Sequence, residues 1–346
     1  MTTFGVNAFG VGTGRRRFET MTELAREAEA AGCTAVWTSE LYSRSATVPM
    51  AALAAGTSTV QIGTNIAYGV GRSPLVWAAE ARDLDELSDG RIILGLGNGT
   101  PKMMEAWHGV SGEAPAARMA DLLTVLKKLW HLHEGPVDHD GRFYSVHIAP
   151  TADVPEPVRP EIPLWIAGVN KYMLRVAGER ADGLIGHPMF TVDYVSGPVA
   201  DEIAVGAARV DRDPADVAIM GIKMCAIHDD LEVARRQAAF AIGQYAASRV
   251  YDRLFELHGW SAAQQEIRQA ARDRDTEALV RAVSDDMIDA IAIACRPGDF
   301  AGELARLPGG FDHLDLIAPP WGLTDEETRA INAAILIGLR EHLGRG

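Results

Sequence analysis

The sequence predicts an α/β protein, specifically a (β/α)8 TIM barrel with insertions. Its 346 residues are 47% hydrophobic and 23% charged, which is enough to bury an extensive core. Short apolar runs alternate with longer segments of helical periodicity, as expected for βα units around a parallel sheet. About eight such units follow one another, and this number favours a closed barrel over an open sheet. We therefore expect a single domain over residues 1–346.

The first half of the sequence supplies four strand and helix pairs. Strands are predicted at Phe4–Phe9, Ala35–Ser39, Val60–Tyr68 and Arg91–Gly95. Helices are predicted at Phe18–Ala31, Val48–Ala55, Pro74–Leu87 and Met119–His131. In the first helix apolar residues recur at helical spacing, and Gly32 suits its C-cap. Strand-like pieces around the turn Asp140-Gly141 predict a hairpin over Gly135–His147, outside the barrel.

The second half continues the alternation and contains the main insertion. Strands are predicted at Leu164–Ala167, Gly183–Ile185, Ala218–Ile227, Ala290–Ala294 and Leu314–Ala318. Helices are predicted at Lys171–Ala181, Asp299–Arg306 and Thr324–Leu343. Between them, Leu231–Ser284 is helical throughout, with only Gly243 and Gly259 as interruptions, and forms a helical insertion. Its aromatic residues are typical of a core, and they are Tyr245, Tyr251, Phe255 and Trp260.

Charge and cysteine content narrow the class of protein. The formal net charge of −14 disfavours binding to nucleic acid or to an anionic membrane surface. Cys33, Cys225 and Cys295 are far apart and form no CxxC pair, so the sequence indicates neither a disulfide framework nor a thiolate metal site. No run of about 18 apolar residues occurs. We therefore expect a cytoplasmic protein that acts on a small molecule.

Three loops rich in glycine and small polar residues follow predicted strands, at Ile62–Pro74, Gly95–Met103 and Ala167–Met173. Barrel enzymes build their sites from loops at the carboxyl ends of the strands. The third loop opens a helix, so its amides could receive a phosphate. Each loop also has a purely structural interpretation, because glycine after a strand is often a turn residue. Arg15 and Thr100 occupy the third glycine position of two GxGxxG-like segments, which excludes a Rossmann dinucleotide site.

One segment resembles a known family closely. Leu84–Gly99, LDELSDGRIILGLGNG, is similar to a long motif of the luciferase-like flavin- and deazaflavin-dependent oxidoreductases. Gly32–Glu40, Ile62–Pro74, Pro163–Gly183 and the turn at Pro297-Gly298 extend the resemblance over almost the whole chain. In that family the cofactor, coenzyme F420 or FMN, lies at the C-terminal mouth of the barrel. The resemblance implies the same position here.

The resemblance also implies individual cofactor contacts. Glu40 stands where the F420-dependent glucose-6-phosphate dehydrogenases place an Asp near the deazaflavin, although such a Glu is equally typical of a structural hydrogen-bond partner. Deazaflavin-dependent members carry a non-proline cis peptide in the loop after the third strand, which falls here at Asn65-Ile66. The stretch from Gly168 matches the backbone amides that hold the cofactor's phosphate. The cofactor-binding residues that the resemblance implies are Glu40, Asn65, Ile66, Tyr68, Asn98, Gly99, Gly168, Val169, Asn170, Tyr172 and Met173.

Two departures from the family separate this sequence from the sugar-phosphate dehydrogenases. Those enzymes use a His directly after the Asp and a Glu directly after the GxGxG turn, whereas this sequence has Leu41 and Thr100. Neither residue can act as a general acid or base. Luciferase also uses a His near this point. We therefore expect a substrate different from that of either enzyme.

The expected substrate side contains few polar residues. His187 matches a substrate-contacting position and could donate a proton after hydride delivery, because an imidazole ordinarily has a pKa near neutrality. Its alternative is a histidine hydrogen-bonded within a loop. Asn7, Thr100 and His108, the last in a predicted loop at Trp107–Val110, are further substrate candidates. The predicted catalytic residues are His187 and Glu40.

The histidines at 131, 133, 139 and 147 do not predict a metal site. His131 and His133 are two residues apart, so they would be poorly placed on a helix to bind one metal ion and would lie awkwardly on a strand as well. No pattern of carboxylates completes a zinc site. Their segment resembles a structural segment of the family.

These observations lead to three functional hypotheses. The first is a hydride transferase that uses coenzyme F420 and a small organic substrate. The second is a luciferase-like monooxygenase that uses FMN, and the third is a non-catalytic flavin-binding protein. A homodimer is expected, because the predicted helices are apolar.

Overall fold

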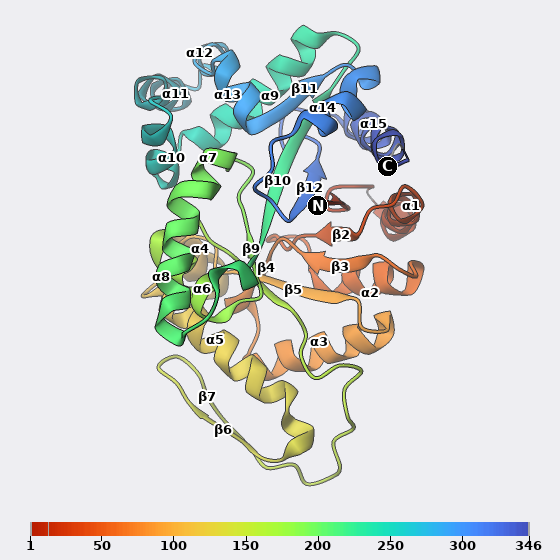
Figure 1. The fold of residues 1–346 in the computed structure, drawn as a ribbon, viewed down its shortest axis with the longest axis vertical. Coiled ribbons are helices and arrows are strands. Elements are labelled where there is room, and N and C mark those ends of the chain that lie inside the picture. The colour runs from red at the N-terminus through yellow and green to blue at the C-terminus, as the bar shows by residue number, and fades with distance from the viewer. Residues whose placement is uncertain (1, 13, 345–346) are drawn as a thin grey trace. The chain divides into compact units, whose positions relative to one another are not determined.

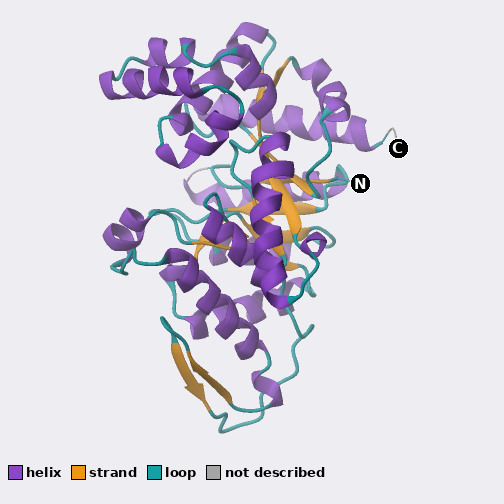
Figure 2. Cartoon of the chain, turned by 60° about the vertical axis from the view of Figure 1, so that its left-hand side comes forward, coloured by secondary structure: helices purple, strands orange, loops and turns teal. Residues whose placement is uncertain are grey.

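A computed structural model describes residues 2–12 and 14–344 and divides the chain into two compact units. The unit that we call terminal comprises Met1–Thr34, Gly186–Val199 and Ile219–Gly346. The unit that we call central comprises Ala35–Ile185 and Ala200–Ala218. Each unit contains parallel strands, and most of these strands are connected by helices, as Figures 1 and 2 show. The two are described separately below.

The sheet of the terminal unit contains four parallel strands in the order β11-β10-β12-β1. They are β1 (Thr3–Asn7), β10 (Ala218–Ile227), β11 (Ala292–Cys295) and β12 (His313–Ile317). Its helices are α1 (Arg17–Ala30), α7 (Val192–Tyr194), α9 (Leu231–Ala246), α10 (Asp252–Leu257), α11 (Ser261–Asp273), α12 (Thr276–Arg281), α13 (Asp285–Ile291), α14 (Phe300–Arg306) and α15 (Asp325–Leu343). The ring of Phe4 on β1 contacts His342 of α15, so this face of the strand is covered by that helix.

The sheet of the central unit runs in the order β2-β3-β5-β8-β9, with the short β4 beside β5. These strands are β2 (Ala35–Thr38), β3 (Gln61–Thr64), β4 (Ala67–Tyr68), β5 (Ile92–Gly97), β8 (Leu164–Ala167) and β9 (Gly183–Ile185). Its helices are α2 (Thr47–Gly56), α3 (Pro74–Ser88), α4 (Pro101–His108), α5 (Pro115–Trp130), α6 (Lys171–Arg180) and α8 (Ala200–Ala207). All these strands are parallel, so their carboxyl ends meet at one edge of the sheet.

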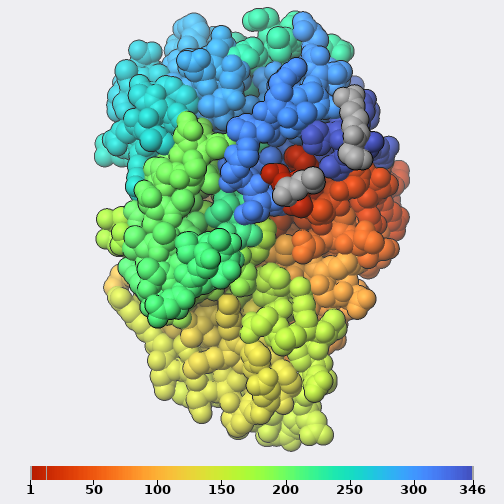
Figure 3. All heavy atoms as spheres, in the orientation of Figure 1, coloured from red at the N-terminus to blue at the C-terminus, as the bar shows by residue number. Residues whose placement is uncertain are grey.

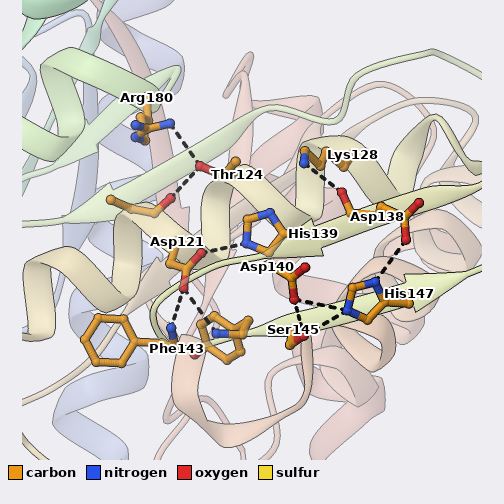
Figure 4. Close-up of polar contacts among 12 residues, drawn as sticks. Asp121, Thr124, Lys128, Asp138, His139, Asp140, Phe143, Ser145, His147 and Arg180 are labelled. Carbon is orange, nitrogen blue, oxygen red and sulfur yellow. Dashed lines mark hydrogen bonds and ion pairs between the residues drawn. The ribbon is translucent and has the colours of Figure 1, made fainter.

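An antiparallel hairpin of β6 (Val137–Asp140) and β7 (Ser145–Ile148) follows α5, as the sequence predicts. Figure 4 shows how it is fixed to that helix. The Asp121 carboxylate accepts hydrogen bonds from the amides of Phe143 (2.6 Å) and Tyr144 (3.1 Å) and contacts His139 Nε2 at 2.7 Å. On the hairpin's exposed face His147 contacts Asp138 at 2.9 Å. The Asp121 carboxylate therefore joins three hairpin residues to α5, and Lys128 adds a hydrogen bond to the Asp138 carbonyl at 2.9 Å.

The same part of the chain contains the four histidines considered as metal ligands. In residues 2–12 and 14–344 no three His, Cys, Asp or Glu side chains are grouped so that they could hold a metal ion. Within the same residues, no helix has both the length and the apolar character needed to cross a membrane.

Several predicted elements differ from the structure. The predicted third strand is divided into β3 and β4 by Asn65 and Ile66, which belong to neither strand. Helix α4, helix α13 and the helical segment from α7 to α8 were not predicted. The first two residues of the predicted strand Ala290–Ala294 belong to α13. The insertion is a series of separate helices, interrupted at Gly259, where φ is +70°, but not at Gly243, which lies inside α9. A Cβ at Gly243 would approach Leu279 Cδ2 to 2.2 Å, so this glycine permits close helix packing.

Candidate functional site

In the central unit the predicted cofactor residues follow the carboxyl ends of β2, β3, β5 and β8. Because these strands are parallel neighbours in one sheet, the segments that follow them lie along one edge. This is the edge at which α/β enzymes bind their ligands. The structure therefore gathers the predicted residues of this unit along a single edge.

Glu40 holds the loop after β3 to the end of β2. Its carboxylate accepts a hydrogen bond from the Tyr68 amide at 2.9 Å and from Arg72 Nη1 at 3.0 and 3.2 Å. Arg72 also pairs with Glu80 at 2.9 Å, and its guanidinium lies 4.4 Å from the centre of the Trp77 ring. Both Glu40 oxygens thus have structural partners. The predicted role of Glu40 beside the cofactor ring stays a prediction.

The peptide bond Asn65-Ile66 is cis, which confirms the expected backbone geometry at this position. The Asn65 amide donates to the carbonyl of Thr38 at 2.8 Å, and the Glu40 amide donates to the carbonyl of Ile66 at 2.8 Å. The Ser39 hydroxyl donates to oxygens of Asn65 at 3.0 Å. The two loops after β2 and β3 are therefore joined by a network of short hydrogen bonds.

Glycines in β5 are required for packing. A Cβ at Gly95 would lie 1.7 Å from the carbonyl oxygen of Thr64, and a Cβ at Gly97 would lie 2.4 Å from Ile66 Cδ1. The Thr64 hydroxyl also donates to the Gly95 carbonyl at 2.7 Å. The GLG sequence of β5 thus lets the end of β3 and the Ile66 side chain approach the strand closely.

Asn98 and Gly99 follow β5 directly. Asn98 is 4% exposed, and its Nδ2 donates to the Pro115 carbonyl at 2.7 Å, whereas its buried Oδ1 has no hydrogen-bond partner in the part of the chain that the structure describes. Gly99, with φ of +66°, lies against the Tyr68 ring. Burial, and then the charge of Glu40, raises the pKa of Tyr68 to about 12, so the phenol keeps its proton. Asn98 Oδ1 is a buried acceptor that a ligand N–H could satisfy.

Thr100 and His108 lie at the two ends of α4. The Thr100 hydroxyl accepts from the Met103 amide at 3.2 Å and caps the helix, and Pro101 occupies its first position. His108 is the last residue of this helix, so the prediction that it lies in a loop is wrong. Its ring centre is 4.9 Å from that of Tyr68, which brings His108 to the cofactor candidates. The substrate-binding roles of both residues stay predictions.

The loop Gly168–Asn170 leads into α6 as predicted. Asn170 is the N-cap residue and makes no side-chain capping bond, and the first amides of a helix have no acceptor within it. A Cβ at Gly168 would lie 3.1 Å from Met173 Cγ, so glycine keeps this turn close to the helix. Tyr172 is 60% exposed, with Lys171 Nζ 5.0 Å from its ring centre. The N-terminus of α6 is thus an open position for an anion, with a lysine beside it.

Asn7 lies at the end of β1 in the terminal unit. Its Nδ2 donates to Asp315 Oδ2 at 3.1 Å, and its Oδ1 accepts from the Phe9 amide at 2.8 Å. Asp315 is fully buried in β12. The structure therefore shows Asn7 holding the turn after β1 to the neighbouring strand.

His187 forms a hydrogen-bonded pair with Tyr251. Its Nδ1 accepts from the Met189 amide at 3.2 Å, so the neutral ring carries its proton on Nε2 and donates it to Tyr251 Oη at 2.7 Å. Burial lowers the pKa of His187 to about 3, although part of the residue remains accessible. Desolvation thus disfavours the charged ring, and the catalytic and substrate-binding roles expected of His187 stay predictions.

Tyr251, Tyr245 and Trp321 were not among the predicted site residues. The ring centre of Tyr245 lies 4.5 Å from that of His187 and 4.5 Å from that of Trp321. Burial and the neighbouring Tyr245 raise the pKa of Tyr251, so its hydroxyl keeps its proton. Sequence analysis placed both tyrosines in a core. Only the contact with His187, which is 64 residues away from Tyr251 in the sequence, reveals the cluster.

Comparisons with known proteins identify the family. The family model described as luciferase-like monooxygenase matches residues 1–310. An uncharacterized protein of Mycobacterium tuberculosis is 31% identical over 329 residues, which cover 90% of this chain and 94% of the relative. A putative coenzyme F420-dependent oxidoreductase of the same organism is 30% identical over 230 residues, which cover 63% of this chain and 64% of the relative.

A solved structure shares the fold. It is the coenzyme F420-dependent tetrahydromethanopterin reductase of Methanopyrus kandleri, with a TM-score of 0.75 and 22% sequence identity, over 97% of each chain. At this identity the likeness shows the fold alone, and that fold is the predicted (β/α)8 barrel. The chain therefore belongs to the luciferase-like monooxygenase family of enzymes.

Proposed function

We propose that the protein is an oxidoreductase that transfers a hydride between coenzyme F420 and a small organic substrate. Two proteins that are similar to this chain are described as F420-dependent. The structural observation that carries the proposal is the buried Asn98 Oδ1, which has no partner in residues 2–12 and 14–344. It lies in the segment after β5, at the edge where β2, β3 and β8 also end.

The residues at this edge fit a deazaflavin. The ring system of such a cofactor carries an amide N–H, and Asn98 Oδ1 is a buried acceptor for a donor of this kind. The phosphate of the cofactor fits the amides of Lys171 and Tyr172 at the start of α6, because the first amides of a helix have no acceptor within it; the Met173 amide already donates to the Asn170 carbonyl at 3.0 Å. Lys171, the first residue of α6, supplies positive charge beside that position, whereas Arg175 on the same helix is already paired with Glu202 at 2.7 Å.

When bound, coenzyme F420 supplies the hydride at its ring C5, and the protein supplies position and electrostatics. Glu40 and Arg72 hold the loop after β3, which keeps Ile66 over Gly97. His187 is uncharged and donates its N–H to Tyr251, so the Tyr251 hydroxyl is the donor of this pair that remains for a substrate.

FMN is the alternative cofactor, and the description of the family as monooxygenases favours it. The tail of coenzyme F420 carries carboxylates beyond its phosphate, whereas FMN ends at the phosphate. Lys171 can pair with those carboxylates, because Arg175 is already paired with Glu202. This difference makes Lys171 the residue that discriminates between the two cofactors.

The proposal is tested by titrating the purified protein with coenzyme F420 and FMN side by side, with fluorescence quenching as the readout. We expect tighter binding of coenzyme F420, and Lys171→Glu should weaken it while changing FMN affinity less. Lys102→Glu, at an exposed lysine of α4, is the matched control. Preference for FMN would move the protein to the monooxygenase branch, and binding of neither would overturn the cofactor assignment. Turnover with activated alkenes, imines, carbonyls or alcohols would rule out the non-catalytic hypothesis.

A further inference from the structure

The terminal unit contains a cavity of about 220 Å³ that is bordered by residues of β10 and β12. Apolar side chains form most of the wall, among them Leu307, Pro308, Phe311 and Leu314. In Figure 3 the blue loop that contains the first three lies next to the green segment of α7, whose Val192 also borders the cavity. These residues precede or begin β12, so the cavity is near the amino-terminal end of that strand, whereas the candidate site follows carboxyl ends.

Lys223 of β10 also borders the cavity and is its buried cation. The residue is 6% exposed, and its Nζ donates to the carbonyls of Ala290 at 3.2 Å and Ile291 at 3.1 Å. An ammonium has three N–H donors, and the described residues supply no acceptor for the third and no carboxylate partner. A buried charge without a counter-charge is unfavourable, so this position favours an anion.

The other polar groups at the cavity already have partners, with one exception. Asp289 pairs with Arg235 at 2.9 Å, and His258 Nε2 lies 2.8 Å from the Thr191 hydroxyl. Asp193 is the carboxylate that remains, and its charge opposes a ligand with more than one negative charge. Burial lowers the pKa of Lys223 to about 8, so its amine is mainly protonated at neutral pH. The cavity therefore combines one available cationic donor with an apolar wall.

We propose that this cavity binds a small monocarboxylate, whose carboxylate accepts a hydrogen bond from Lys223 and whose apolar tail packs against Phe311 and Leu314. The carboxylate gives the buried ammonium both its missing acceptor and its counter-charge. A concave apolar wall with few convergent polar groups is typical of small-molecule sites. The size of the cavity fits a short aliphatic or single-ring acid.

The test is isothermal titration of the purified protein at neutral pH with benzoate and hexanoate, and with benzamide and hexanamide as uncharged probes of the same shape. We expect binding of the acids and much weaker binding of the amides. Lys223→Met should weaken acid binding about tenfold or more, because a charge-assisted hydrogen bond is lost. This variant should fold, since an apolar side chain of similar length replaces a buried charge.

Two further variants complete the experiment. Val192→Phe narrows the cavity and leaves Lys223 unchanged, so it should also abolish binding of the acids. Lys102→Met removes an exposed lysine of α4 and should bind them as the wild type does. Equal affinity for benzoate and benzamide, undiminished binding by Lys223→Met, or no heat from either acid would overturn the proposal.

Discussion

Protonation of His313 should lower the free energy of unfolding as the pH falls below neutrality. Its side chain is buried in β12, 5% exposed, with Nδ1 2.8 Å from the Thr3 hydroxyl. Burial lowers its pKa from 6.5 to about 4. The unfolded chain therefore binds the proton at a higher pH than the folded chain does. Its contribution to the free energy of unfolding is complete above pH 6.5 and is lost as the pH falls toward 4.

The size of this effect follows from the shift in pKa. The shift from 6.5 to about 4 corresponds to about 3 kcal/mol in full. Between about pH 7.5 and pH 5, the difference between the folded and unfolded pKa values lowers the free energy of unfolding by about 2 kcal/mol. We expect His313→Gln to reduce the pH dependence of the unfolding free energy by this amount, whatever its stability at neutral pH.

The measurement is urea unfolding followed by tryptophan fluorescence at several pH values in this range, for wild type and His313→Gln. His147→Gln is the control, because Asp138 and Asp140 raise the pKa of this exposed histidine. The contribution of His147 is therefore present at low pH and lost as the pH rises through the raised pKa, which is the opposite sign. A variant His313→Gln with the same pH dependence as wild type would refute the reasoning.

Three further predictions follow from the contacts described above. Glu40→Ala should lower the affinity for coenzyme F420 without loss of the fold, as fluorescence titration and circular dichroism would show; unchanged affinity would contradict a role in cofactor binding. Gly95→Ala should prevent folding, because its Cβ would collide with the backbone of Thr64. Gly97→Ala should lower the free energy of unfolding by about 1–3 kcal/mol, because its Cβ meets only the end of the Ile66 side chain. Urea unfolding that showed Gly97→Ala to be the more destabilising variant would contradict this packing. Asp121→Asn should increase hydrogen exchange in residues 137–148, because a weaker acceptor would face two hairpin amides; unchanged protection would show that other contacts hold the hairpin.

Periodicity in the sequence was sufficient to predict most strands and helices. Strand β8 has the predicted bounds, because Pro163 directly precedes its apolar run and Gly168 directly follows it. Helix α4 was missed, because a Gly-rich motif precedes it and a loop was expected to continue to Met103. Its start is determined by a local capping bond of Thr100 together with Pro101 at the first position. A capping threonine followed by proline is a helix-start signal that the sequence itself contains.

The candidate site could be predicted only in part. The cofactor residues of the central unit follow strands, so the strand prediction also placed them along one edge. The pairing of His187 with Tyr251 depends on tertiary contacts across 64 residues, which sequence spacing does not encode. The low pKa of His187 depends on the same burial. The unsatisfied oxygen of Asn98 likewise became visible only when its neighbours were placed.

The close approach of β5 to Thr64 and Ile66 bears on what the Leu84–Gly99 motif can diagnose. Two of its glycines are fixed by steric exclusion, since any side chain at Gly95 or Gly97 would collide with the neighbouring segment. The motif is consequently typical of chains in which the end of β3 and the residue after it pack closely against β5. It does not by itself indicate which cofactor such a chain binds. Residues that select the cofactor are therefore expected at positions where other side chains also fit. Lys171, which is exposed on the surface of α6, is at such a position.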